Sequence, residues 1–387
     1  MFTTSNAALP ETVDEAVEKK NTAHFRNIRH WIASGKQETQ TLFIDDYDPS
    51  ANSSIYATLK STKPSWKAIF ISLNTDKPRE SWDIEKIRAK KVFVCLSWKR
   101  AAMSQLVPLL RQATDLTTMG MPPPWGNTPW VSLLQLEITR FADDTTSDYV
   151  KFGATTLRKI FDAAVNLETL VLDFCVAYKT PSNSETQDRD RVRHGALKSL
   201  SFALHHLEEN GCLFGIQIDP PLLRHATVLS SDRSRLSENP SEIETWQGVT
   251  SVTVDLLADG EVTALVQFLR CLPKVASIEL QGKCTDALFI LVNGFYSHIP
   301  PSYSTILFPK LTKVTMANTD IEGKTLIKML ETRLAQLESG LDWVSAVTDV
   351  TLYDADKVTP MDWERVNTLL ESDRVTSIPD TAMMPSG

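Results

Sequence analysis

The sequence predicts an α/β fold in which an irregular solenoid of strand–helix units follows a mainly helical N-terminal region. Three observations support this fold class. A strand pattern, apolar-x-x-apolar-x-apolar, recurs after residue 130. Helix-like stretches fill most intervals between these strands, as expected of parallel strands joined by crossovers. Glycine is scarce, at 14 of 387 residues, and no G-x-G is present, so the phosphate-binding turn of a Rossmann fold is absent.

Residues 1–62 are predicted to form a helix followed by a strand. Pro10 suits the first helical position, and the acidic residues after it complement the positive end of the helix dipole. Apolar residues then recur at helical spacing as far as Ile32, and Gly35 is a suitable stop. Residues 41–44 form a short apolar run of strand-like length.

Residues 63–119 are predicted to form a helical module, and the alternative is a strand at residues 68–73, an apolar run of strand-like length. The segment 83–110 carries apolar residues at roughly helical spacing with charges between them. Pro108, near its end, would kink or stop a helix. Three consecutive prolines follow within residues 120–129, and this segment is predicted to be a stiff linker and the main domain boundary.

Residues 130–387 are predicted to form the solenoid, a leucine-rich-repeat-like array. Seven triplets carry the strand pattern: Leu133-Leu136-Ile138, Leu167-Leu170-Leu172, Leu213-Ile216-Ile218, Val249-Val252-Val254, Val275-Ile278-Leu280, Leu311-Val314-Met316 and Val347-Val350-Leu352. A doubly wound sheet would give a similar alternation of strands and helices. The solenoid is favoured because the strands are only half apolar and the units resemble one another. Ser251, Thr253, Lys313 and Thr315 would then point outward onto the concave face.

Two polar segments interrupt the repeat pattern. Residues 179–191 are polar and end in alternating charges, and residues 229–245 are rich in serine and glutamate. Both are predicted to be exposed loops inserted into the array. Either a phosphorylated regulatory loop or an ordinary solvated loop fits this composition.

Composition and charge argue against several classes of protein. The chain is 42% hydrophobic and has a net charge of -8, which suits a folded protein and argues against nucleic-acid binding. No apolar run approaches the ~20 residues of a membrane span, and the first residues lack the features of a secretory signal. The five cysteines include no C-x-x-C, so we expect reduced thiols and a cytoplasmic or nuclear location.

Motifs that would indicate an enzyme or a cofactor are absent or incomplete. Gly323-Lys324-Thr325 resembles the end of a P-loop, but Asn318 occupies the position of the first glycine, so a helix-capping turn is predicted instead. His205 and His206 lie near Cys212, but adjacent side chains on a helix point in different directions. We therefore predict no catalytic site, no cofactor and no metal.

Several segments resemble fungal F-box-like proteins. The segment FPKLTKVTMANTDIEGKTLIKMLETR (308–333) resembles the strand and short helix repeated in their irregular leucine-rich-repeat region, and VTDVTLYDADKVTPMDWERVNTLL (347–370) resembles a later repeat of the same kind. Upstream, Val94-Cys95-Leu96-Ser97-Trp98 is similar to the V-C-x-x-W signature that closes an F-box. The segment 63–70 resembles the opening of that motif.

The resemblance implies a function in protein–protein recognition. In this family the F-box is a small helical module that docks an adaptor subunit of cullin-RING ubiquitin ligases, and the repeats hold the substrate protein. The residues that would belong to the adaptor-binding module here are Pro64, Ile69, Phe70, Val94 and Trp98. The sequence therefore predicts a substrate receptor of a ubiquitin ligase, with the adaptor and an unknown substrate protein as partners and without nucleic-acid or membrane binding. The alternative is a leucine-rich-repeat scaffold with no link to a ligase.

Overall fold

A computed structural model gives the structure of the chain as two compact units, Met1–Thr145 and Thr146–Gly387. The residues that it describes are 41–45, 65–73, 88–96, 106–119, 123, 125–126, 128–139, 153–172, 191–204, 207, 212–214, 216–229, 246–255, 265, 268–269, 271–282, 308–317, 319, 321–340, 344–353 and 357–376. The predicted helix of residues 10–35, the loop segments 179–190 and 230–245, and four of the histidines and cysteines considered above (His205, His206, Cys175 and Cys284) lie outside these residues.

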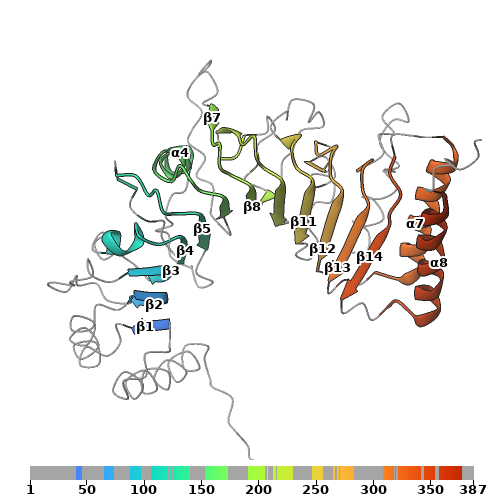
Figure 1. Ribbon diagram of the computed structural model, residues 1–387, viewed down its shortest axis with the longest axis horizontal. Coiled ribbons are helices and arrows are strands. Elements are labelled where there is room, and N and C mark those ends of the chain that lie inside the picture. Colours follow the sequence, from blue (N-terminus) through green and yellow to red (C-terminus); the bar gives the residue numbers. More distant parts are fainter. Residues whose placement is uncertain are drawn as a thin grey trace, which may run out of the picture. The chain divides into compact units, whose positions relative to one another are not determined.

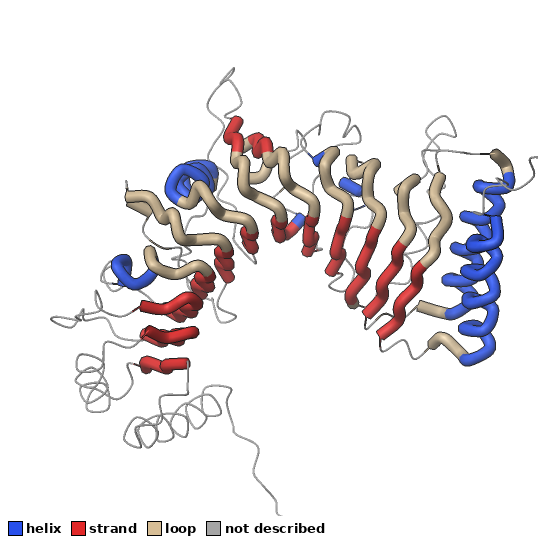
Figure 2. Tube along the Cα trace, in the orientation of Figure 1, coloured by secondary structure: helices blue, strands red, loops and turns tan. Residues whose placement is uncertain are grey.

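The first unit contains a parallel sheet whose strands are added in chain order (Figures 1 and 2). Its strands are β1 (Thr41–Asp45), β2 (Ser65–Leu73), β3 (Arg88–Leu96), β4 (Asp115–Met119) and β5 (Gln135–Thr139). Each pairs in parallel with the next. A short helical segment at residues 106–110 precedes β4.

The prediction of a helical module at residues 63–119 is wrong for most of the residues described there, because β2, β3 and β4 occupy that region. The alternative of a strand at residues 68–73 is confirmed, since these residues lie in β2. Apolar residues in β3 fall at Ala89, Val92, Phe93 and Val94, a spacing compatible with one face of a helix. The core is nevertheless built from alternate residues, since Val92 and Val94 are fully buried. Short apolar runs cannot be assigned to helix or strand by periodicity alone, and here the pairing with β2 and β4 decides.

The proline-rich segment 120–129 is also not a linker between domains. The strands on either side of it, β4 and β5, are paired neighbours in one unit, with Asp115 opposite Gln135. Trp130, directly after the segment, is fully buried, and its ring lies 4.7 Å from that of Trp125. The segment therefore connects two neighbouring strands of one unit, and Trp125 within it contacts the buried Trp130.

The second unit contains a longer parallel sheet, again with strands added in chain order. Its strands are β6 (Thr169–Leu172), β8 (Ser199–Ala203), β10 (His225–Leu229), β11 (Ser251–Asp255), β12 (Ser277–Gln281), β13 (Lys313–Ala317) and β14 (Asp349–Tyr353). A small separate sheet pairs β7 (Arg191–Arg193) with β9 (Gln217–Asp219). The helices are α4 (Ala154–Ala163), α7 (Gly323–Glu338) and α8 (Pro360–Thr376), and α7 and α8 lie side by side next to β14 (Figure 1).

Six of the seven predicted strand triplets are confirmed as strands of the large sheet region. In each, the first residue lies in the turn before the strand, and the other two occupy its second and fourth positions, as in Val249-Val252-Val254. All of these strand positions are buried except Leu352 in β14, which is partly exposed. Leu213-Ile216-Ile218 is the wrong prediction, because Ile218 lies in β9 of the small sheet. The strands at this point are instead β8 and β10, whose triplets are Leu197-Leu200-Phe202 and Leu223-Ala226-Val228.

The core of the second unit joins successive repeats through aromatic contacts. Phe202, on the inner side of β8, has its ring 5.3 Å from that of Trp246 and 5.8 Å from that of Phe268. The Trp246 and Phe268 rings meet edge to face at 5.4 Å. All three side chains are buried, so these contacts stabilise three consecutive repeats against one another.

A backbone ladder fixes the spacing of the strands at the point where each begins. The carbonyl of the residue before a strand accepts two N–H groups from the next repeat. Thr250 O, for example, accepts from Ala276 N at 2.8 Å and Ser277 N at 3.2 Å. The carbonyl oxygens of five other residues accept two N–H groups in the same way: Glu168, Lys198, Arg224, Ala276 and Thr312. Five residues of each strand then pair in register with the next strand, so equivalent side chains form rows across the sheet.

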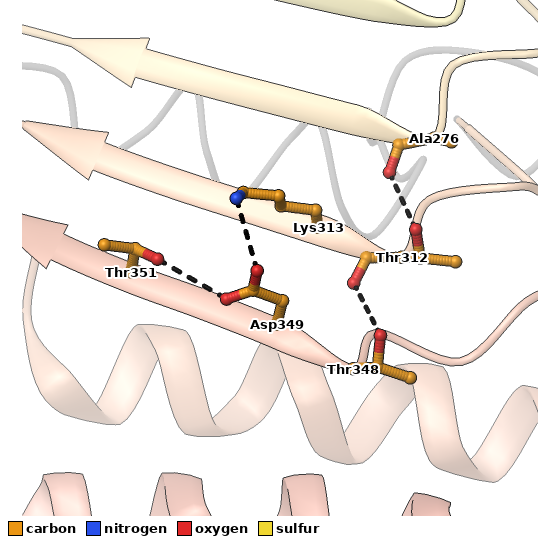
Figure 3. Close-up of polar contacts among 6 residues, drawn as sticks. All are labelled: Ala276, Thr312, Lys313, Thr348, Asp349 and Thr351. Carbon is orange, nitrogen blue, oxygen red and sulfur yellow. Dashed lines mark hydrogen bonds and ion pairs between the residues drawn. The ribbon is translucent and has the colours of Figure 1, made fainter.

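Threonine side chains strengthen this ladder toward β14 (Figure 3). Thr312 Oγ1 donates to Ala276 O at 3.1 Å, and Thr348 Oγ1 donates to Thr312 O at 3.4 Å. The donors stand 36 residues after their acceptors. The carbonyl of Thr312 therefore receives the hydroxyl as well as the two backbone N–H groups of the next repeat.

Arg333 is a buried cation that joins two successive turns of this ladder. Its side chain, on α7, is 3% exposed. Nη2 donates to Phe308 O at 2.7 Å and to Pro309 O at 3.0 Å, and Nε donates to Ser345 O at 3.0 Å. Burial lowers the pKa of Arg333 to about 10, a value at which the side chain stays charged at neutral pH. The guanidinium thus supplies donors to carbonyls in the turns that precede both β13 and β14.

His194 occupies a turn position that is apolar in the neighbouring repeats. The equivalent residues are Ala164, Pro220, Trp246, Leu272 and Phe308, all buried. His194 Nε2 donates to Ala164 O at 3.0 Å, and the ring lies 5.0 Å from that of Phe161. Nδ1 has no hydrogen-bond partner within the described part of the chain. Burial lowers the pKa of His194, an effect that the bond to Ala164 partly offsets, so the neutral ring is the folded form.

Replacing Arg333 by methionine should lower the free energy of unfolding by about 3 kcal/mol, because three carbonyls lose a charged donor in a site that water does not reach. Arg365→Met is the matched control. Its guanidinium bonds Glu331 Oε1 at 2.9 Å on the surface, and we expect a loss below about 1 kcal/mol. Denaturant unfolding measures both changes. Equal losses in the two variants would contradict the assigned role of Arg333.

His194 should make the unfolding free energy fall as the pH drops from about 7 toward 5. The folded-state pKa is lowered, so the unfolded chain binds a proton first, below ~6.5, and stability present above that pH is lost on acidification. Denaturant unfolding of His194→Leu across this range should show a shallower fall than the wild type. An unchanged pH dependence in the variant would show that His194 does not contribute.

Candidate functional site

The outward side of strands β10–β14 carries mainly hydroxyl and charged side chains, and we call it the hydroxyl face. It consists of the first, third and fifth residue of each strand: His225, Thr227, Leu229, Ser251, Thr253, Asp255, Ser277, Glu279, Gln281, Lys313, Thr315, Ala317, Asp349, Thr351 and Tyr353. The alternate residues are buried in the core, except Leu352 in β14, which is partly exposed. The sequence placed Ser251, Thr253, Lys313 and Thr315 on this outward side, and the strand alternation confirms it.

Strand register arranges the hydroxyl face in three rows. The middle row runs through Thr227, Thr253, Glu279, Thr315 and Thr351, which stand opposite one another on successive strands. Neighbouring strands lie ~4.8 Å apart, so each row places a polar group at every step along an extended line. This periodic set of short donors and acceptors can bind the backbone and side chains of another polypeptide.

His225 links two hydroxyl groups at one side of the face. Its Nδ1 lies 3.2 Å from Ser251 Oγ on the next strand, and its Nε2 lies 3.1 Å from Thr227 Oγ1 on the same strand. A neutral imidazole has one N–H donor and one acceptor nitrogen, so one hydroxyl accepts and the other donates. Partial burial lowers the pKa of His225, while the Glu279 carboxylate acts in the opposite direction.

Two carboxylates lie at the centre of the hydroxyl face. Asp255 stands opposite Gln281, and Glu279 stands opposite Thr253. Gln281 Nε2 donates to Glu279 Oε1 at 2.7 Å, which fixes that carboxylate over β12. Burial raises the pKa of Asp255, because its charged form loses part of its hydration.

The charges nearer the C-terminal side of the face are paired (Figure 3). Lys313 Nζ lies 3.3 Å from Asp349 Oδ2 across β13 and β14. Thr351 Oγ1 lies within 3.4 Å of Asp349 Oδ1. Both partners of the ion pair are half exposed, so the pair contributes little stability, and it leaves the Asp349 carboxylate neutralised by Lys313.

The outward side of the first unit has a different character. Phe70 on β2 is 37% exposed, and its ring lies 5.5 Å from that of Phe93 on β3. Further along, Thr117 Oγ1 donates to Glu137 Oε2 at 3.1 Å. Cys95 Sγ lies 3.9 Å from Met119 Sδ. The first unit therefore presents an aromatic and sulfur-containing side where the second presents hydroxyl groups.

The five residues expected to form an adaptor-binding module do not form a helical cluster where the structure describes them. Ile69 and Val94 are fully buried core residues of β2 and β3, while Phe70 points to the opposite side of β2 and is partly exposed. The register places Phe70 opposite Phe93, not opposite Val94. Pro64 and Trp98 lie outside the described residues.

The other sequence motifs give no chemical site within the described residues. Lys324 is exposed in the first turn of α7, and Gly323 packs against the Asp362 side chain at the start of α8. The helix begins at the predicted place, but no side chain caps it, since its N-cap residue Glu322 makes no side-chain capping hydrogen bond. Across the described part of the chain, no three His, Cys, Asp or Glu side chains gather closely enough to hold a metal. The helices that are described include none with the length and hydropathy needed to cross a membrane. Cys95, Cys212 and Cys271 are thiols.

Comparison with known proteins adds no assignment. No protein-family model matches the chain, and no curated protein matches it in sequence. The candidate site therefore rests on the arrangement of the strand face alone.

Glu279→Gln should lower the pKa of the His225 imidazole, because the carboxylate favours the protonated ring. Nuclear magnetic resonance titration of the imidazole measures this pKa in the wild type and in the variant. Glu364→Gln, an exposed carboxylate on α8, is the control and should leave the value unchanged. A His225 pKa that rises in Glu279→Gln would contradict the described electrostatics.

Proposed function

We propose that the chain is a leucine-rich-repeat-like solenoid that recognises another protein through the hydroxyl face. Repeat length supports the fold proposal. His225 and Ser251, which are register partners, stand 26 residues apart, within the 20–29 residues of a leucine-rich repeat. The register carries the same spacing from β8 to β10 and from β11 to β12. The last two steps, to β13 and β14, are 36 residues.

The main support for this function is the hydroxyl face, whose rows of outward side chains continue across the five strands β10–β14, which pair in register. Such a face offers regularly spaced side chains that can change without disturbing the core, because the buried positions alternate with them. Its hydroxyl groups, carboxylates and single lysine suit hydrogen bonding to an extended polypeptide. An acidic chain of net charge -8 disfavours nucleic acid as the occupant.

The scaffold form of this function has more support than the ligase-receptor form. A receptor would need the helical adaptor-binding module, and strands β2 and β3 occupy most of the residues expected to form it. Adaptor binding is supported only by the sequence resemblance of Val94-Cys95-Leu96-Ser97-Trp98, and it stays a prediction.

The test is affinity capture with chemical crosslinking, using the full chain and a Thr253→Arg variant. Thr253 stands between Thr227 and Glu279 in the middle row, so an arginine there would block the face. Asn367→Arg, at an exposed position of α8, adds the same side chain elsewhere. We expect the wild type and Asn367→Arg to capture partner proteins. The captured amount should fall by about tenfold or more in Thr253→Arg.

Thermal unfolding of both variants checks that the fold is retained. Capture of the same partners by Thr253→Arg at wild-type yield would overturn the proposal, as would a wild-type chain that captures no partner. A cullin-RING adaptor among the captured proteins would support the ligase-receptor form, and its absence would favour the scaffold.

A further inference from the structure

The two central carboxylates of the hydroxyl face, Asp255 and Glu279, form no ion pair with another described residue, although Gln281 donates a hydrogen bond to Glu279. Five other described acidic side chains form ion pairs: Lys91–Asp115 at 2.9 Å, Arg191–Asp219 at 3.1 Å, Lys198–Glu168 at 2.6 Å, Lys313–Asp349 at 3.3 Å and Arg365–Glu331 at 2.9 Å. Asp255 and Glu279 pair with no lysine, arginine or histidine among the described residues.

These carboxylates also share one connected patch. Asp255 lies opposite Gln281, and the amide of Gln281 bonds Glu279. Around them stand the hydroxyl groups of Thr253 and Ser277 on the same two strands. Partial burial of Asp255 disfavours its charge, and a cation placed beside it would offset that cost.

We propose that the segment bound by the hydroxyl face is an extended, lysine- or arginine-bearing stretch of a partner protein. Its cation lies between Asp255 and Glu279, and its backbone runs along the middle row of hydroxyl groups. This inference rests on the proposed function and specifies the chemistry of the partner.

Charge complementarity favours a lysine- or arginine-bearing segment over a nucleic acid or an apolar helix as the occupant of the hydroxyl face. Phosphate groups of a nucleic acid would meet two uncompensated carboxylates. An apolar helix would find Leu229 as the one apolar side chain among the outward residues of β10–β12, which gives no buried anchor. A lysine or arginine segment supplies both the missing charge and donors for the neighbouring oxygens.

The probe is a fluorescein-labelled peptide of alternating lysine with serine or threonine, measured by fluorescence anisotropy with the full chain at ~0.15 M salt, where weak long-range attraction is screened. A peptide with glutamate in place of lysine is the charge control. We expect saturable binding of the lysine peptide and none of the glutamate peptide.

The double variant Asp255→Asn with Glu279→Gln should raise the dissociation constant of the lysine peptide about tenfold. The matched control is Glu364→Gln with Glu371→Gln, which removes two exposed carboxylates of α8 and changes the net charge equally. It should change the dissociation constant less than about twofold. Equal weakening in both variants would assign the binding to net charge and overturn the inference. Absent binding, or equal binding of the glutamate peptide, would do the same.

Two further results separate this inference from the proposed function. If Thr253→Arg loses its captured partners while Asp255→Asn with Glu279→Gln keeps them, the face recognises protein but not through a cation, and only the inference fails. If Thr253→Arg keeps its partners, both fail. Sedimentation of the wild type as a dimer that Thr253→Arg dissociates would identify a second copy of the chain as the occupant, and would also overturn the inference.

Discussion

The double hydrogen bond at the start of each strand is the constraint on which the rest of the second unit depends. One carbonyl, such as Thr250 O, accepts two N–H groups from the following repeat. This bond pair sets the register before the strand begins, and a slip by one residue would turn every core side chain outward. The rows of the hydroxyl face and the buried triplets therefore follow from the same backbone contact.

Two buried polar side chains show how the turn region tolerates exceptions to an apolar core. Arg333 is accommodated because three turn carbonyls accept its protons. His194 bonds the carbonyl of Ala164, the equivalent position one repeat earlier. Both side chains donate to carbonyls of the turns, so each joins neighbouring segments of the sheet. The charge of Arg333 is satisfied by these bonds, whereas His194 is neutral and needs only one of them.

The sequence revealed the repeated strand and its outward residues, but not the complete order of strands. Apolar residues at the turn, second and fourth positions identified β11 to β14 because Val249, Val275, Leu311 and Val347 are all present. Near residue 200 the pattern fits both Leu197-Leu200-Phe202 and Leu213-Ile216-Ile218. Extending the 26-residue step backward from Val249 would have selected the first, because it also gives Leu223. The apolar triplet alone does not distinguish the two, and in the structure the pairing of β8 with β6 and β10 decides between them.

The first unit and the carboxylates were less accessible to sequence analysis for other reasons. In β4 the buried position Thr118 is polar, so an apolar triplet search misses that strand. In β2, Ile69 and Ile71 are buried while Phe70 is partly exposed, and the apolar run conceals the alternation. Asp255 and Glu279 are ordinary acidic residues in the sequence. Their significance depends on register, which places Gln281 beside Asp255 and leaves both carboxylates without a cation among the described residues.

Amide hydrogen exchange at the ladder tests the central claim most directly. We predict that the paired donors Ala276, Ser277, Thr312 and Lys313 exchange at least about a thousandfold more slowly than in an unfolded peptide, because each N–H bonds a carbonyl that precedes the neighbouring strand. Exposed residues at the tips of the turns, such as Lys274 and Lys310, should exchange much faster. Exchange of the four ladder amides as fast as these turn amides would contradict the account.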